Sequence, residues 1–267
     1  MSELVSKAEV RQYWDAEPCG TRGLNLEEDS FFTESEERRY RLDGPLVFGF
    51  AEFTRFRGKR VLEIGVGTGS DFVQWVRAGA EAHGIDLTPR GVELTRLRLE
   101  REGLFADVAV GDAENLAFPD DHFDLVYSWG VLHHTPDTSR AIEEVRRVLA
   151  PGGEARIMLY HRRSWVALQA WLRYGLLTLR SVERVLRERV ESPGTKAYTA
   201  SEARDLFRSF RQVEARPRLT PYDTFDYTPR SVHGASLREL VRRVYPRGLV
   251  RAFGDDLGWN LLIKATK

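Results

Sequence analysis

The segment Val61-Leu-Glu-Ile-Gly-Val-Gly-Thr-Gly69 decides the fold, because an apolar run passes directly into three closely spaced glycines. Such a short apolar run is typical of a buried strand. Glycines at positions 65, 67 and 69 allow a sharp turn that brings the backbone close to a ligand. The dinucleotide fingerprint G-x-G-x-x-G has its third glycine one residue later, where this chain has Ser70. The compact turn therefore favours a ligand without a pyrophosphate, and a turn that serves packing alone is the alternative.

Short apolar runs alternate with longer helical patterns from the glycine turn to residue 160. The runs predict buried strands at residues 60–64, 82–86, 106–110, 123–128 and 155–160. Between them, amphipathic helices are predicted at residues 70–79, 89–102 and 138–149. This alternation predicts an α/β fold in which helices cover both faces of a parallel sheet.

The pattern changes after residue 160. Residues 161–190 form a helical stretch dense in Arg, Leu and Trp, and a Ser-Pro-Gly break follows at residues 192–194. Thr199 and Glu202 have the spacing of a capping box, which predicts that a helix over residues 203–210 begins there. A long stretch, 219–256, reads mostly as loop. The remaining predicted elements are two strands at residues 212–216 and 259–265 and one short helix at residues 236–245.

The composition excludes several classes of protein. Forty basic and forty acidic residues among 267 cancel, so no net field attracts nucleic acid or a membrane surface. Cys19 is the single cysteine, which excludes an intramolecular disulfide and a cysteine-rich metal site. The first residues lack a signal-peptide pattern, and no apolar stretch is long enough to span a bilayer. We therefore expect a cytoplasmic protein with no metal, no nucleic-acid partner and no membrane association.

Acidic side chains stand at the ends of two predicted strands. Asp86 ends the second strand about twenty residues after the glycines, where a carboxylate accepts hydrogen bonds from ribose hydroxyls. Asp112 follows the third strand, and a second carboxylate there suits the exocyclic amine of adenine. Either acid alone reads as an ordinary cap. The carboxyl ends of parallel strands meet at one sheet edge, so both acids and the glycine turn together predict a nucleoside-binding site.

Five segments occur in a fixed order: LEIGVGTG (62–69), GID (84–86), GDAENLAF (111–118), DDHFDLVYSWGVLHHTPD (120–137) and EEVRRVLAPGG (143–153). In this combination the chain resembles the class I S-adenosylmethionine-dependent methyltransferases, of the small-molecule type related to the ubiquinone-biosynthesis methyltransferases. The resemblance implies a Rossmann-like, seven-stranded mixed sheet with a final antiparallel hairpin. It also implies S-adenosyl-L-methionine as the methyl donor.

The resemblance further implies which residues hold the donor. Gly65 and Gly67 are expected at its methionine part and Asp86 at its ribose. The segment 10–20 resembles an N-terminal helix that covers the cofactor in some members, so Tyr13 or Trp14 would lie over the donor, or both would only pack that helix. Adenine would lie between Asp112 and Ala113, and Ser128 would border the sulfonium. The complete predicted cofactor set is Glu63, Gly65, Gly67, Asp86, Leu87, Asp112, Ala113, Ser128 and Tyr13.

Three histidines are the candidate catalytic residues. Methyl transfer needs a positioned donor and, where the acceptor must lose a proton, a base. His133 and His134 follow the fourth predicted strand, and His161 follows the fifth. Histidine titrates in the range that such a base requires. The alternative is that these rings only orient the loops that carry them.

The helical stretch after the fifth strand has three interpretations. It would form a lid over an apolar or aromatic acceptor pocket, with nearby arginines for an acidic group. A hairpin that packs a homodimer or the sheet edge is the second, and an amphipathic segment on lipid is the third. Its predicted apolar face consists of Trp165, Leu168, Trp171, Leu172, Leu176 and Leu179.

The sequence as a whole predicts a methyltransferase that acts on a small-molecule acceptor. The alternatives are a catalytically silent cofactor-binding subunit and a nicotinamide-dependent oxidoreductase. We divide the chain into an N-terminal helical segment (1–58), the donor-binding core (59–160), the helical insertion (161–198) and a C-terminal part with the final hairpin (199–267).

Overall fold

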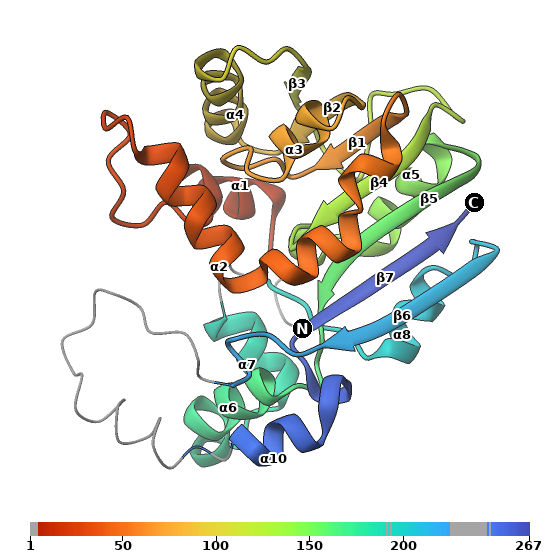
Figure 1. The fold of residues 1–267 in the computed structure, drawn as a ribbon. Coiled ribbons are helices and arrows are strands. Elements are labelled where there is room, and N and C mark those ends of the chain that lie inside the picture. The colour runs from red at the N-terminus through yellow and green to blue at the C-terminus, as the bar shows by residue number, and fades with distance from the viewer. Residues whose placement is uncertain (1–4, 191, 193, 225–244, 246) are drawn as a thin grey trace.

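In a computed structural model, which describes residues 5–190, 192, 194–224, 245 and 247–267, seven strands form one mixed sheet. The strands are β1 (Arg60–Ile64), β2 (Glu81–Asp86), β3 (Asp107–Val110), β4 (Phe123–Trp129), β5 (Leu149–Tyr160), β6 (Gln212–Arg218) and β7 (Asn260–Thr266). Their order across the sheet is β3-β2-β1-β4-β5-β7-β6 (Figure 1). β7 runs antiparallel to β5 and β6, whereas the pairs among β1 to β5 are parallel. The predicted fold and its final antiparallel hairpin are confirmed.

Helices lie before β1 and between successive strands, except between β3 and β4, where residues 111–122 form a loop. The α-helices are α1 (Lys7–Ala16), α2 (Phe31–Ala51), α3 (Phe72–Arg77), α4 (Pro89–Arg101), α5 (Thr138–Val148), α6 (Trp165–Tyr174), α7 (Val182–Arg189), α8 (Ala200–Leu206) and α10 (Arg247–Ala252). Short 3-10 turns are η1 (Phe53–Phe56), η2 (Leu132–His134), η3 (Leu176–Thr178) and η4 (Gly254–Leu257). Among the described residues, no helix is long and apolar enough to cross a membrane.

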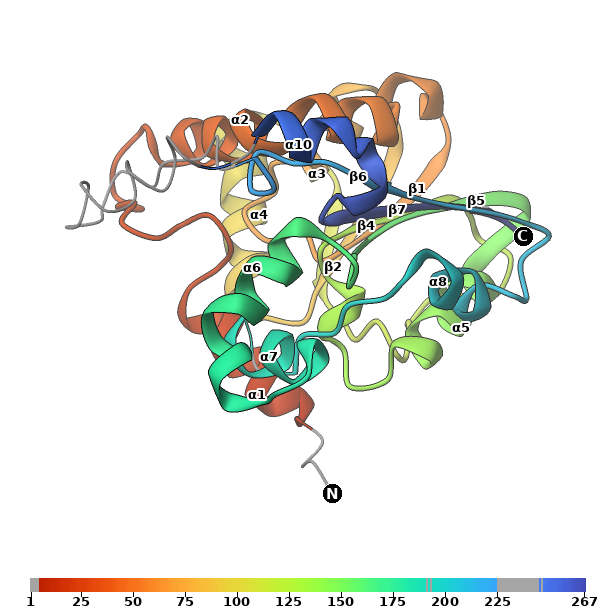
Figure 2. The same ribbon diagram turned by 90° about the horizontal axis from the view of Figure 1, so that it is seen from below.

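Apolar side chains of the sheet alternate between two cores. Helices α5 and α8 pack on one face, and α2, α3 and α4 pack on the other (Figure 2). Along β5, Ile157 and Leu159 enter the first core, whereas Met158 and Tyr160 enter the second. This alternation follows from the period of two along a strand. Because both faces are covered, ligands are accommodated at the carboxyl edge of the parallel strands.

Two elements, β5 and α8, differ from their predicted bounds by three residues or more. β5 begins at Leu149 rather than at residue 155, because the ladder with β4 continues past an irregularity between Phe123 and Leu125. Helix α8 covers 200–206 rather than 203–210. Its cap Thr199 accepts a hydrogen bond from Glu202 N, so the helix begins at the next residue.

The stretch 219–256 contains more structure than the sequence predicted. The short helix predicted at residues 236–245 lies outside the described residues except for Tyr245. Helix α10 and turn η4 follow it, and neither was predicted. The carboxylate of Asp223 accepts hydrogen bonds from the backbone N–H groups of Thr220 and Trp259, which ties the start of this stretch to the start of β7.

The insertion after β5 is a helical hairpin made of α6, η3 and α7. Trp171 closes it, since its indole Nε1 donates to the carbonyl of Arg180 at 2.9 Å. The tip is open to solvent: Leu177 and Leu179 are 96% and 95% exposed, and Leu168, Leu172 and Leu176 are exposed as well. Four of the six side chains expected on one apolar face are therefore exposed, and the other two, Trp165 and Trp171, are half-buried. The interpretation of the hairpin as a lid or a dimer contact stays a prediction.

Candidate active site

The glycine turn after β1 has the backbone geometry that the sequence predicted. Gly65, Gly67 and Gly69 all have positive φ, at 85°, 53° and 77°, a region that favours glycine. A Cβ atom on Gly65 would lie 2.2 Å from the side chain of Val131, so the loop after β4 packs directly on this turn. A Cβ atom on Gly67 would meet nothing within 4 Å. Gly67 thus presents bare backbone to open space, as a ligand-contacting turn requires.

Asp86 stands beside this turn at the end of β2. Its Oδ2 accepts the backbone N–H of Gly67 at 2.9 Å. Its Oδ1 accepts the backbone N–H and the hydroxyl of Thr88, at 2.9 and 2.7 Å. Thr88 in turn caps α4. A carboxylate has about four acceptor positions, so Asp86 is held rigidly and keeps capacity for a further donor. Leu87 stands between Asp86 and Thr88 in the sequence.

Glu63 is buried behind the turn and serves the packing of α3. Its Oε2 accepts the indole N–H of Trp75 at 2.9 Å. Burial, and next the negative charge of Asp71, raise the pKa of Glu63 well above its ordinary value. Ser128, also fully buried, donates its hydroxyl to the carbonyl of Ile64 at 2.9 Å and so joins β4 to β1. Glu63 lies on β1 and Ser128 on β4, and the hydrogen bonds described here join both side chains to other residues of the chain.

An arginine of α2 binds the segment that follows the turn. Arg39 donates to Asp71 at 2.7 Å and to Asp43 at 3.0 Å, and its guanidinium lies 5.0 Å from the ring centroid of Trp129. Tyr127 donates its hydroxyl to the same oxygen of Asp71 at 2.9 Å. The other oxygen, Oδ1, is buried and accepts no hydrogen bond from any residue that the structure describes. The sequence did not reveal this network, because 32 residues separate Arg39 from Asp71.

Helix α1 reaches the predicted adenine end of the site. Lys7 binds Asp112 at 2.7 Å and Glu114 at 2.6 Å. Between these acids, Ala113 is buried. At the other end of α1, the ring of Trp14 contacts that of His134 with centroids 5.3 Å apart. Tyr13, the predicted aromatic neighbour of the donor, is 43% exposed and packs edge-on against Trp14.

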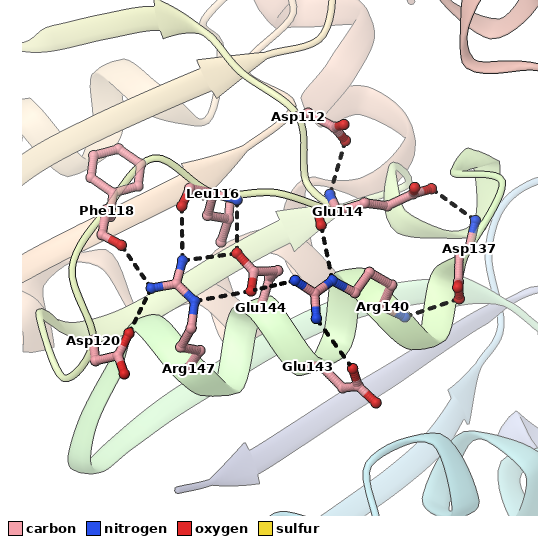
Figure 3. A network of polar contacts seen from close by, with 10 residues as sticks. All are labelled: Asp112, Glu114, Leu116, Phe118, Asp120, Asp137, Arg140, Glu143, Glu144 and Arg147. Carbon is pink, nitrogen blue, oxygen red and sulfur yellow. Dashed lines mark hydrogen bonds and ion pairs between the residues drawn. The ribbon is translucent and has the colours of Figure 1, made fainter.

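The loop after β3 is clamped to α5, as Figure 3 shows. Glu144 accepts the backbone N–H of Leu116 at 2.8 Å. Arg147 donates to the carbonyls of Leu116 and Phe118, each at 2.8 Å, and to Asp120 at 2.7 Å. Arg147 also donates to the carboxylate of Glu144, and this hydrogen bond is the main cause of the lowered pKa of Glu144. The conformation of the Asp112 loop therefore depends on side chains about thirty residues further on.

The three candidate histidines have different surroundings. His133 is fully buried between the rings of His134 and Tyr160, and neither ring nitrogen has a hydrogen-bond partner among the described residues. Burial lowers its pKa well below the ordinary value, so the ring is neutral. Nδ1 of His134 lies 2.8 Å from the hydroxyl of Ser192. Nδ1 of His161 lies 3.1 Å from the carbonyl of Gly258.

Two cavities lie near these segments. One, of about 590 Å³, is lined by His161 together with parts of α8, β6 and η4. The other, of about 640 Å³, lies between α5, α7 and α8 and is lined by charges of both signs. His133 and His134 line neither of them. Of the three histidines, His161 is therefore the one that borders one of these two cavities. In the described ranges, no three His, Cys, Asp or Glu side chains group as a metal ion would require.

Comparison with known proteins agrees with this geometry. A family model described as "Methyltransferase domain" matches residues 62–157. The chain is 35% identical over 159 residues to phthiotriol/phenolphthiotriol dimycocerosates methyltransferase 1 of Mycobacterium ulcerans, which covers 54% of this chain and 57% of the relative. It is 36% identical to ubiquinone biosynthesis O-methyltransferase of Cereibacter sphaeroides, over 39% of this chain and 44% of the relative. The chain thus matches about half the length of these curated relatives.

A solved structure extends the likeness to nearly the whole fold. One chain in the structure of the complex between the Haloferax volcanii Trm112 methyltransferase activator and the putative methyltransferase matches this chain with a TM-score of 0.60 and 19% identity. The match covers 96% of this chain and 96% of that chain. The same fold also occurs in the [4+2]-cyclase SpnF, with a TM-score of 0.57, 19% identity and coverage of 91% of this chain and 84% of that one. At these identities the likeness shows the fold alone. The domain matched over residues 62–157, the relatives and the strand order together make this chain similar to the class I S-adenosylmethionine-dependent methyltransferases.

Proposed function

We propose that this chain transfers a methyl group from S-adenosylmethionine to a small, partly apolar or aromatic acceptor by direct in-line displacement. One observation carries the proposal: the bare turn at Gly67 lies against a rigidly held carboxylate, Asp86, at the carboxyl edge of the sheet. The names of the relatives, which concern phthiotriol dimycocerosates and ubiquinone biosynthesis, support a small-molecule acceptor. A nicotinamide dinucleotide fits this compact turn less well, because Ser70 stands where the dinucleotide fingerprint has its third glycine.

The residues present suit the donor. Asp86 has acceptor capacity for ribose hydroxyls, and Leu87 follows it at the same edge. Buried Asp71 Oδ1, two residues beyond Gly69, is an unsatisfied acceptor that an ammonium group would satisfy. We assign the remaining cofactor contacts to Gly65, Gly67, Asp112, Ala113 and Tyr13, and we expect Glu63 and Ser128 to hold the turn and the strand ends in place.

Methyl transfer requires few catalytic groups from the protein. When bound, the donor supplies a methyl group on a sulfonium, which is a good leaving group. The chain has to orient both reactants, exclude water and, for a protonated acceptor, remove a proton. We assign the removal of that proton to His161. The carbonyl of Gly258 can only accept, so Nδ1 of His161 carries the hydrogen and Nε2 has a free lone pair in the neutral ring.

Asp86→Ala tests the donor site. We expect affinity for S-adenosylhomocysteine, the demethylated product, to fall by about tenfold or more, because a charged acceptor of hydrogen bonds is lost. Calorimetric titration measures this directly. Asp107→Ala is the matched control, since Asp107 begins the neighbouring strand β3 at the opposite sheet edge and its side chain is 89% exposed. Equal affinity of both variants and the parent would remove Asp86 from the site.

Transfer itself is tested with isotopically labelled donor and a panel of small aromatic and apolar acceptors. Incorporation of label into an acceptor supports the proposal. A chain that binds S-adenosylhomocysteine yet labels no acceptor in the panel would favour the silent cofactor-binding subunit. A chain that binds a nicotinamide dinucleotide more tightly than S-adenosylhomocysteine would favour the oxidoreductase.

A further inference from the structure

The cavity beside His161 is strongly cationic. It lies where the carboxyl ends of β5 and β6 meet the beginning of α8 and the turn η4. Its volume of about 590 Å³ falls within the range of small-molecule sites. Its charged lining consists of Arg163, Arg204, Arg216, Arg218, Asp255 and Asp256. The arginines therefore outnumber the acids by two to one.

Ion pairs neutralise only part of this charge. Arg218 binds Asp255 at 2.8 Å, and Arg216 binds Glu214 at 2.5 Å. Arg204 makes one long hydrogen bond, at 3.4 Å, to the carbonyl of Ala215. For Arg163, no ion pair or hydrogen bond of its side chain is found within the described part of the chain. Two guanidinium groups at this cavity thus lack a carboxylate partner, and only the carboxylate of Asp256 remains to offset them.

The inner wall of the cavity is formed by His161, which is nine-tenths buried. Its Nδ1 is fixed by the carbonyl of Gly258, as described above, and its other nitrogen has no hydrogen-bond partner among the residues that the structure describes. Burial first, then the charges of Arg163 and Arg162, lower the pKa of His161, whereas the Gly258 carbonyl and Asp256 raise it. The ring is therefore neutral at pH 7 and gains a second donor if a negative charge approaches.

We propose that this cavity binds a carboxylate or phosphate group carried by the methyl acceptor, with Arg163 and Arg204 as its charge partners and His161 at the reactive end. Guanidinium groups bind such anions with paired hydrogen bonds. The cavity is larger than one phosphate, and it lies at the same sheet edge as the donor site. In the sheet order, β5, which precedes His161, is two strands from β1, and β6, which forms the far side of the cavity, is four strands from it. The link to methyl transfer rests on the proposed function, whereas anion binding does not.

The test uses inorganic phosphate and the full chain, with the ring resonances of the histidines followed by NMR. We expect a saturable shift at His161 and a rise of its pKa toward the ordinary value, because a bound anion stabilises the imidazolium. The double variant Arg163→Gln, Arg204→Gln should have an affinity for phosphate at least tenfold lower than that of the parent protein. Arg211→Gln is the matched control, since Arg211 is exposed at the other end of β6 and should leave the affinity unchanged.

Larger probes distinguish an acceptor group from a free ion. Phenyl phosphate and benzoate should bind at least tenfold more tightly than inorganic phosphate and acetate, respectively, if the rest of the cavity holds an acceptor. Equal affinities would overturn the assignment to the acceptor. No saturable shift at His161, or the same shift in the double variant, would overturn the anion site. Binding of S-adenosylhomocysteine is measured on each variant, so that loss of the donor site or of the fold is recognised separately.

Discussion

His161→Ala is expected to lower kcat by about a hundredfold or more, while the affinity for S-adenosylhomocysteine stays within about twofold of the parent. The reason is that the variant removes the one histidine, among those that the structure describes, whose ring borders the cationic cavity and whose tautomer is fixed by a backbone carbonyl. The measurement is single-turnover kinetics with labelled donor and an acceptor found in the panel described above. His122→Ala serves as control, because His122 lies at the opposite end of β4 and should leave kcat unchanged.

The pH dependence gives a second reading of the same assignment. A general base acts in its deprotonated form, and burial lowers the pKa of His161 from its ordinary value of 6.5. In the parent enzyme, kcat should therefore be constant at neutral pH and fall only as the pH drops below about 6.5. The variant should lack this acid limb. If kcat of the variant is near normal and the limb persists, His161 is not the base, and the same measurement on His134→Ala follows.

Arg39→Met is expected to lower the free energy of unfolding by about 3 kcal/mol. Arg39 is the cation between Asp71 and Asp43, and its side chain is 22% exposed. Without it, two largely buried carboxylates face each other and Glu63 across a short distance with no opposite charge in their centre. Methionine keeps most of the apolar stem, so the change reports the charge rather than the packing. Urea denaturation of both proteins, read by fluorescence and circular dichroism, measures the difference.

Arg38→Met provides the comparison for this loss. Arg38 is the preceding residue of α2. Its ion pair with Glu34 is long, 3.8 Å, and partly exposed, and its hydrogen bond to the carbonyl of Arg22, at 2.8 Å, lies at the surface as well. Removing such a surface pair should change the free energy of unfolding by less than about 1 kcal/mol. Equal losses for Arg38 and Arg39 would mean that the Arg39 network adds no stability beyond that of a surface ion pair. A large loss at Arg39 alone would show that the contacts of Arg39 with Asp71 and Asp43 contribute to the stability of the fold.

Local sequence patterns were sufficient for the first four strands. Short apolar runs and the glycine turn predicted β1 to β4 to within about one residue, because these signals depend on neighbours in the chain. The relation of Asp86 to the turn was predictable for the same reason, since parallel strands end at one edge. The start of α8 was predictable as well, had Thr199 been taken as the residue directly before the helix.

Local sequence patterns did not predict the contacts between segments that are far apart in the chain. Arg39 meets Asp71, and Lys7 meets Asp112, only because the two N-terminal helices fold back onto the core. No spacing in the sequence distinguishes either residue from the many other basic side chains. The tautomer of His161 likewise depends on Gly258, which is 97 residues away. The apolar residues of the insertion gave a helical period, but period alone does not show whether a face is buried or exposed.

Helix α1 has a consequence for the order of events in a catalytic cycle. Lys7 holds one end at the tip of β3, and Trp14 rests on His134 beyond β4 at the other end. The tips of β2 and β1 lie between those two points in the sheet, so a nucleoside bound there would be enclosed beneath α1. Exchange of spent donor for fresh donor would then proceed no faster than α1 detaches. Because the Lys7 contacts are partly exposed ion pairs, that detachment would be sensitive to ionic strength, and turnover would depend on salt even where the transfer step itself does not.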